Sequence, residues 1–260
     1  MDIRRYFVIP VLVGYIFING LVPASAREEG LAPLLDKISK RMNSYPENSN
    51  WKYSVVTKTT EMDKQWRPKK TTITTSIVKE VDNVLSGEIK KAVETEDGIT
   101  KDVTEKIAKQ AKKQLERTNK ERAEQKGQKG TGNEYDVFFP FNENKRAKFA
   151  FHRLDDAVIN ERPVFIIEAV AKEKDEQIYE GKFYIDQTTY DILKVRVKPS
   201  KNPRFVEELD MDIDFEVLPE GKFIRRRSRT RVDGGLLFKR FRMIVEEEYF
   251  DIEILDSSAI

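Results

Sequence analysis

The stretch Glu208–Val217, with the sequence ELDMDIDFEV, alternates acidic and apolar residues without exception. A period of two places the apolar side chains on one face of a β-strand and the carboxylates on the other. Such alternation is typical of an antiparallel sheet whose two faces meet different surroundings. Pro219-Glu220-Gly221 follows as a turn signal, and Phe223 begins the next apolar run. The stretch therefore predicts the first arm of a β-hairpin.

Most of the chain on either side of this hairpin has the same character. Downstream of Tyr135, turn sequences separate predicted strands at 147–154, 163–171, 178–186, 190–198, 209–217, 223–232, 236–245 and 249–255. Upstream, strands are predicted at 51–56, 71–81 and 84–94, and the last of them ends at the turn signal Asp97-Gly98. Because strands do not alternate with helices, the pattern indicates a mainly β chain with an antiparallel sheet.

Two stretches have helical periodicity instead. The first is a predicted helix from Glu28 to about Tyr45, whose apolar face consists of Leu31, Leu34, Leu35, Ile38 and Met42. The second is predicted to begin at Thr100 as its N-cap, and its thin apolar face consists of Val103, Ile107, Ala111 and Leu115. Residues 116–126 are almost all polar. Two interpretations of this charged insertion are open. The first is a basic arm that binds lipid headgroups or an acidic partner, and the second is a solvated helix with internal salt bridges.

The N-terminus has the features of an export signal. Arg4 and Arg5 precede a 13-residue apolar run, and Ala24-Ser25-Ala26 supplies the small residues that signal peptidase requires. We expect residues 1–26 to be a signal peptide, cleaved between Ala26 and Arg27, and residues 27–260 to form one periplasmic domain. The alternative is an uncleaved membrane anchor, although the run is shorter than the roughly 20 residues that span a bilayer.

Composition excludes several classes of function. The chain has 47 Lys+Arg and 45 Asp+Glu, so its net charge of +2 gives no reason to expect nucleic-acid binding. It has no Cys and one His, which excludes disulfides, thiolate catalysis and multi-His metal sites. A mean hydropathy of -0.60 argues against further membrane spans. No cofactor or metal is therefore expected.

No catalytic constellation stands out. His152 is the only imidazole, and no Gly-x-Ser-x-Gly sequence accompanies it. Asp210, Asp212 and Asp214 follow the strand period, as a solvated face does, instead of gathering as a carboxylate pair in a cleft. The arginines of 225–231 are expected to pair with this acidic strand. We therefore expect a protein that is not an enzyme.

Two segments carry a family resemblance. Gly181–Asp186 (GKFYID) followed by Thr188–Val195 (TTYDILKV) resembles the hairpin of the LolA/LolB-like lipoprotein-carrier superfamily, as does Leu209–Val217 followed by GKFI. The resemblance implies a strongly curved, unclosed antiparallel β-barrel packed around an N-terminal amphipathic helix, with an apolar concave face. It also implies binding of acyl chains, or a role in envelope stress or assembly. The charged helical insertion at about 100–132 departs from that pattern.

The hairpin suggests a ligand site. If Leu218 and Gly221 close the turn, partner numbers in the two strands sum to 439, and four acids then lie opposite arginines. The opposite face would take an acyl tail on five residues and a polar head on Arg226; the five are Leu209, Met211, Ile213, Phe215 and Ile224. Alternatively, Arg226 reaches solvent or pairs with an acid from the helix.

The sequence thus predicts an exported carrier for an apolar or lipid-like ligand, such as a lipoprotein acyl chain. The alternative is a ligand-free module that binds envelope proteins through its charged arm. A continuous apolar cavity would favour the carrier, and a concave face filled by the chain's own side chains would favour the module.

Overall fold

The computed structural model describes residues 30–45, 50–82, 84–125, 139–219, 221, 223–236 and 239–255. The predicted signal peptide, with Ala26 and Arg27, lies outside the described residues. The helices are α2 (Leu31–Met42), α3 (Thr104–Gln125) and α4 (Glu143–Arg146). The strands are β1 (Trp51–Met62), β2 (Pro68–Val81), β3 (Val84–Glu96), β4 (Ile99–Asp102), β5 (Phe149–Arg153), β6 (Ala157–Ile159), β7 (Arg162–Ala171), β8 (Tyr179–Asp186), β9 (Ile192–Pro199), β10 (Val206–Val217), β11 (Phe223–Leu236) and β12 (Lys239–Ile254).

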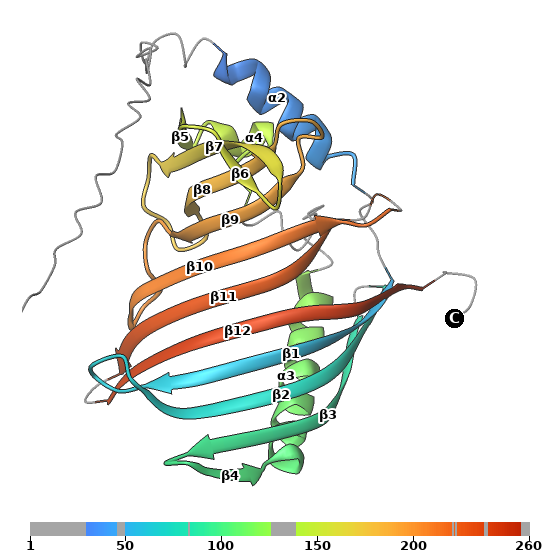
Figure 1. The fold of residues 1–260 in the computed structure, drawn as a ribbon, viewed down its shortest axis with the longest axis vertical. Helices are drawn as coiled ribbons and strands as arrows, with labels where there is room; N and C mark the ends of the chain where they lie inside the picture. Colours follow the sequence, from blue (N-terminus) through green and yellow to red (C-terminus); the bar gives the residue numbers. More distant parts are fainter. Residues whose placement is uncertain are drawn as a thin grey trace, which may run out of the picture.

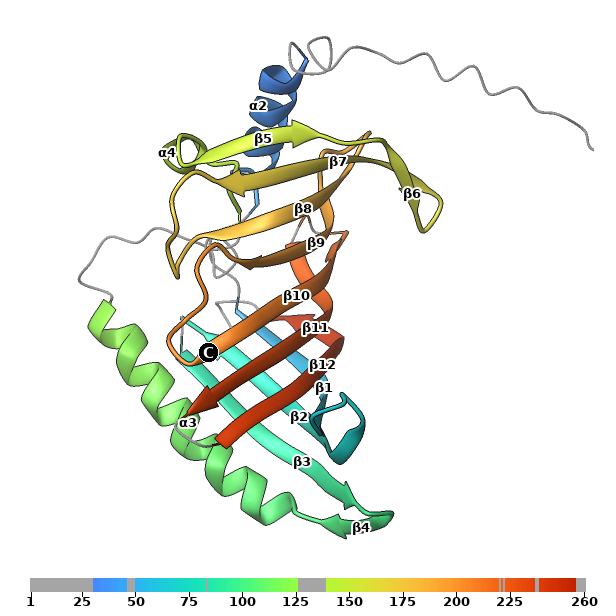
Figure 2. The same ribbon diagram turned by 90° about the vertical axis from the view of Figure 1, so that its left-hand side faces the viewer.

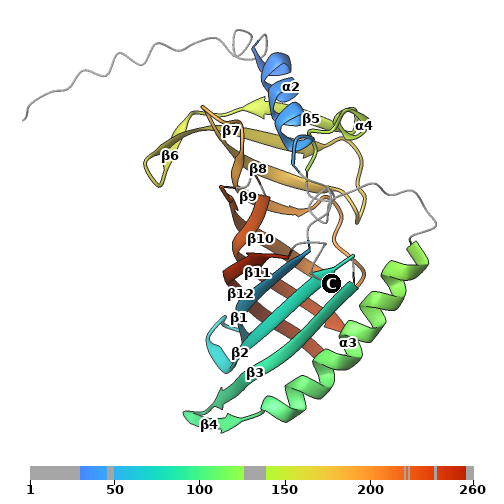
Figure 3. The same cartoon turned by 90° about the vertical axis from the view of Figure 1, so that its right-hand side faces the viewer.

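The strands form one twelve-stranded antiparallel sheet, in the order β4-β3-β2-β1-β12-β11-β10-β9-β8-β7-β5, with β6 paired to β7. The two edges lie at opposite ends of the molecule, so the sheet does not close (Figure 1). Seen from the sides, the sheet is strongly curved, and α3 runs along β3 (Figures 2 and 3). The predicted fold class, an unclosed and curved antiparallel sheet with an N-terminal packing helix and a helical insertion, is confirmed.

Strand register defines two faces that can be followed across the sheet. A single row of neighbours crosses six strands and consists of Ile213, Ser228, Glu247, Thr57, Thr74 and Ala92. Ile213 belongs to the core beneath α2, and the backbone of Ala92 bonds to residues at the start of α3. Both helices therefore lie on the same side of the sheet, which we call the inner face.

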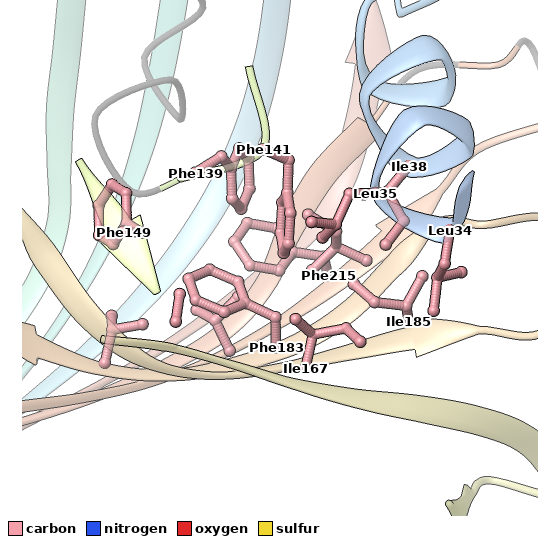
Figure 4. Close-up of a cluster of buried hydrophobic side chains, with 14 of the residues drawn as sticks. Leu34, Leu35, Ile38, Phe139, Phe141, Phe149, Ile167, Phe183, Ile185 and Phe215 are labelled. Atoms are coloured by element: carbon pink, nitrogen blue, oxygen red, sulfur yellow. The ribbon is translucent and has the colours of Figure 1, made fainter. Parts of the chain in front are cut away.

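The packed half consists of α2, α4 and β5–β10, and it contains the hydrophobic core. The apolar stripe predicted for the first helix is buried against the sheet, as Figure 4 shows for Leu34, Leu35 and Ile38. The 139–141 segment and the first residue of β11 add further aromatic rings to this cluster. The burial of aliphatic and aromatic side chains therefore stabilises this half of the fold.

The open half consists of α3, β1–β4, β11 and β12. Two predictions about its elements are wrong. Thr100 lies in β4 and is not a helix N-cap, because the Asp97-Gly98 turn returns the chain onto β3. Helix α3 begins instead at Thr104, whose N–H donates to Asp102 Oδ1. The predicted strands 236–245 and 249–255 are one continuous strand, β12, because Glu246–Glu248 continues the ladder to β11 and β1.

Candidate functional site

The residues predicted to take an acyl tail lie in the packed half, where the chain's own side chains already surround them. Ile213 and Phe215 on the inner face of β10 are 1% and 6% exposed, and Met211 packs against the same cluster. The ring of Phe215 stacks on that of Phe223 with centroids 4.6 Å apart, and the ring of Phe139 lies 5.8 Å away. At these positions the concave face is filled.

The other predicted ligand residues do not line a common cavity with this cluster. Leu209 is half-buried opposite Val232, and Ile224 is buried opposite Glu216. The Arg226 guanidinium forms an ion pair with Glu216 at 2.9 Å. Arg226 thus pairs with an acid, as the alternative interpretation expected, although the acid comes from a strand and not from the helix.

The predicted register of β10 and β11 is wrong by two residues. Partner numbers along most of the ladder sum to 441 and not 439, so Asp214 lies opposite Arg227 and Asp212 opposite Arg229. The irregularity between Asp214 and Phe215 places Ile224 and Arg226 on the side of Glu216, so their predicted position on the concave face is wrong. From Arg227 onward, a shift of two residues keeps each side chain on its predicted face. For this reason acids still lie opposite arginines in the observed pairing.

The cause of the shift is local irregularity in β11. The turn does close, since the Gly221 N–H bonds the Leu218 carbonyl oxygen at 2.8 Å. The ladder nevertheless resumes one residue late, at Val217 opposite Phe223, and it shifts by one more between Asp214 and Phe215. Extra residues of this kind are β-bulges, which alternation alone does not reveal.

The outer face carries a lattice of charges that neutralise one another. One row across five strands reads positive, negative, positive, negative, positive, and it consists of Arg196, Asp212, Arg229, Glu246 and Lys58. Asp212 accepts a bond from Arg196 at 3.0 Å, and Lys58 lies 3.1 Å from Glu246. The arginines of β11 thus contact glutamates of β12 as well as facing the aspartates of β10. In this outer row of three basic and two acidic residues, each acid contacts a basic side chain of a neighbouring strand.

Beside this lattice, Lys194 bridges two aspartates. Its Nζ contacts Asp212 and lies 2.9 Å from Asp214. Burial works to lower the pKa of Lys194, but the hydrogen bonds from Lys194 to Asp212 and Asp214 outweigh burial and raise it. Lys194 therefore stays charged at neutral pH and ties β9 to β10.

On the inner face a polar cluster marks the boundary between the two halves. The Arg225 guanidinium donates to the Tyr249 hydroxyl and lies over its ring, 4.6 Å from the centroid. Tyr249 and Ser228 donate to Glu247 Oε2 at 3.0 and 2.7 Å. Burial raises the pKa of Tyr249, so its hydroxyl remains a neutral donor. The residues of this cluster are scattered in the sequence and carry no local signal, since only the register brings them together.

Beyond that boundary the inner face carries hydroxyl groups beside apolar side chains such as Val245 and Met243. On β1, β2 and β11, alternate residues place small polar side chains on this face, namely Thr57, Thr59, Thr72, Thr74, Ser76, Ser228 and Thr230. Most of them are partly exposed. Ile73 and Ile77 alternate with these residues along β2 and point to the outer side.

Helix α2 is held to the packed half by a polar contact as well. The Tyr45 hydroxyl donates to Asp191 Oδ1 at 2.6 Å, and Arg41 Nε donates to the same atom at 2.6 Å. Burial, followed by the bond to Asp191, raises the pKa of Tyr45. Asp191 is itself buried, so its charge requires these two partners. The contact fixes the end of α2 on the β8–β9 hairpin.

Helix α3 covers the free edge of β3. The Asn119 side chain receives a bond from the Leu85 N–H at 2.9 Å and donates to the Leu85 carbonyl oxygen at 2.7 Å. Arg122 Nη1 lies 2.8 Å from Glu80 Oε1. Asn119 thus takes the place of a neighbouring strand, and protecting an edge in this way prevents unwanted strand addition.

The remaining candidate groups give no sign of a catalytic centre. His152 is exposed on β5, opposite Glu168. Within the described ranges, no group of three or more His, Asp or Glu side chains is arranged to hold a metal ion. In the same part of the chain, no helix is both long and apolar enough to cross a membrane.

Among known proteins, several solved structures are similar to this chain. No protein-family model matches the chain, and no curated protein matches it in sequence. A LolA superfamily protein from Nitrosomonas europaea is 12% identical at a TM-score of 0.37, covering 86% of this chain and 93% of that one. An outer membrane lipoprotein-sorting protein domain from Vibrio parahaemolyticus is 12% identical at a TM-score of 0.39, covering 86% and 94%.

A third similar structure comes from a complex. The MucA/MucB complex of Pseudomonas aeruginosa gives 8% identity and a TM-score of 0.26, covering 88% of this chain and 100% of the matched chain. These matches are a likeness to solved structures alone. At such identities and scores they do not identify a ligand or a partner.

Proposed function

We propose that this protein is an exported, non-catalytic module of the cell envelope that acts by binding a partner protein. The observation that carries the proposal is the filled concave face of the packed half, where α2 and the 139–141 segment occupy the space that an acyl chain would need. Of the two functions predicted from sequence, this observation favours the interaction module over the lipid carrier.

The open half is a poor host for an acyl chain for a different reason. Burying apolar surface stabilises a complex by about 25 cal/mol per Å², but here hydroxyl groups and the Glu247 carboxylate interrupt the apolar side chains of the inner face. Covering each hydroxyl group with hydrocarbon costs about 1–3 kcal/mol. A polypeptide, which donates and accepts hydrogen bonds, suits this half better.

The absence of catalysis is part of the proposal. The carboxylates that could serve as acid and base are engaged in the outer lattice, with Asp212 and Glu246 in contact with basic side chains of neighbouring strands. General acid–base work needs such a group free to exchange a proton with a substrate. Export to the periplasm, expected from the sequence of residues 1–26, completes the proposal.

Native mass spectrometry of protein released from the periplasm tests the choice between carrier and module. We expect the mass of a chain that begins at Arg27, with no lipid adduct. A stoichiometric phospholipid or lipopeptide adduct would contradict the module and support the carrier. A mass retaining residues 1–26 would contradict cleavage of the signal peptide.

Photo-crosslinking in the living cell tests the partner directly. A photoreactive residue in place of Thr74, on the inner face of the open half, is expected to give a protein adduct. The same residue in place of Val158, exposed on β6 of the packed half, serves as the matched control and should give none. A lipid adduct at Thr74, or equal protein adducts at both sites, would overturn the proposed function.

A further inference from the structure

The outward face of α3 carries a straight stripe of basic residues. They are spaced 3, 4, 4 and 3 residues apart, and they are Lys106, Lys109, Lys113, Arg117 and Lys120. At 100° per residue the five fall within an arc of about 80° and extend over about 21 Å. All five side chains are exposed. Between the first and the last, the only acidic residue is Glu116, which lies outside this arc.

The opposite face of α3 fixes the direction in which the stripe points. The partly buried residues Ile107, Ala111 and Leu115 lie about half a turn from its centre, and the last of these approaches Gly87 of β3. The bonds of Asn119 to Leu85 prevent the helix from rolling. The basic stripe is therefore held away from the sheet, where a second molecule can reach it.

On the basis of the proposed function, we infer that the basic stripe of α3 binds an acidic helix of the partner protein. The carboxylates of that helix recur at the same 3-4-4-3 spacing. Charge complementarity defines the partner, and the spacing defines its conformation. A helix repeats these intervals as rises of about 4.5 and 6 Å. Alternate residues of an extended strand recur every 6.6–6.8 Å, so five of them would span about 27 Å and lose register with the stripe.

An anionic membrane fits these observations less well. The exposed Glu105 and Glu116 lie beside the stripe, where a flat negative surface would repel them. The large apolar residues of α3, Ile107 and Leu115, are partly buried, and Leu115 packs towards β3, so neither is placed to enter a bilayer. A rod-shaped acidic partner avoids both difficulties.

The test uses two synthetic helical peptides of identical composition. One has five glutamates at 3-4-4-3 spacing, and the other has the same glutamates spread around the helix. Fluorescence anisotropy with the exported chain should give tighter binding of the patterned peptide, weakened by added salt. Changing the five stripe residues to Gln should weaken that binding by about tenfold to a hundredfold.

A charge-matched variant provides the control. Five exposed lysines outside α3 are changed to Gln, namely Lys64, Lys69, Lys79, Lys182 and Lys198, and this variant should bind as wild type does. Equal binding of both peptides, or wild-type binding by the stripe variant, would overturn the inference. So would stripe-dependent binding to phosphatidylglycerol vesicles without preference for the patterned peptide, or stripe-dependent self-association in sedimentation. If native mass spectrometry shows no bound lipid and any of these results is obtained, the inference about the stripe fails while the proposed function stands.

Discussion

The packed half and the open half share one sheet, yet different forces hold them. In the packed half the inner face is dry, and residues such as Phe183 and Ile185 are fully buried beneath α2 and the 139–141 segment. In the open half the inner face carries hydroxyl groups, and α3 contacts the sheet at β3. The comparison teaches that continuous β-pairing lets one end of a sheet supply stability while the other end remains available for binding.

The largest expected difference between the halves comes from the same substitution made in each. Ile185→Ala in β8 removes a side chain with 0% exposure and should cost about 2–5 kcal/mol of unfolding free energy. Ile73→Ala in β2, where the side chain is 40% exposed, should cost under about 1 kcal/mol. Urea unfolding followed by circular dichroism measures both. Equal losses would contradict the division into halves.

A second comparison concerns two aspartates with similar turn contacts. Asp186 accepts the N–H groups of Thr188 and Thr189 at 2.8 Å and lies 2.7 Å from Arg162. Burial works to raise its pKa, but the backbone hydrogen bonds and Arg162 outweigh burial and lower it. Its stabilising effect is therefore present above the unfolded pKa of about 3.9 and is lost as pH falls through the lower folded value.

Asp186→Asn should accordingly cost about 1–3 kcal/mol at neutral pH, with the difference from wild type shrinking in acid. Asp63 in the open half makes similar bonds to the N–H groups of Gln65 and Arg67, but it is more exposed. Asp63→Asn is the matched control and should cost less. Denaturant midpoints across the acid range check both variants. A loss for Asp186→Asn that does not change with pH would refute the electrostatic explanation.

A smaller effect is expected on the outer lattice of the open half. Glu246→Gln removes the carboxylate between Lys58 and Arg229 and should cost about 0.2–1 kcal/mol at low salt. Because salt screens exposed charges, the difference from wild type should fall as ionic strength rises. Glu161→Gln, at an exposed position in the turn between β6 and β7, is the control. A salt-independent loss would indicate that Glu246 acts through packing.

The smallest effect is expected at Arg226. Arg226→Ala removes one partly exposed ion pair with Glu216, so the thermal midpoint should stay nearly unchanged. Under the proposed function native mass spectrometry should show no lipid adduct on either the variant or the wild type. Loss of a bound lipid in this variant alone would restore the ligand role predicted from the sequence.

Much of the fold follows from local patterns in the sequence. Period-two alternation in Glu208–Val217 predicts β10 and assigns its acids to the outer face, and the structure agrees. The spacing of Leu31, Leu34, Leu35 and Ile38 predicts the buried stripe of α2. These features depend on the geometry of a single strand or helix, which the order of residues fixes directly.

Tertiary structure decided what those elements meet. Two bulge-like shifts moved the β10–β11 register from 439 to 441, and Arg226 became the partner of Glu216. Chain reversal at Asp97-Gly98 added β4 before α3, and distant residues filled the concave face. Within β10 and α2 the sequence by itself determined which residues face which side, because periodicity is local. Only the tertiary structure decided whether the inner face is hollow, because filling it requires α2, the 139–141 segment and β10 to meet across long stretches of chain.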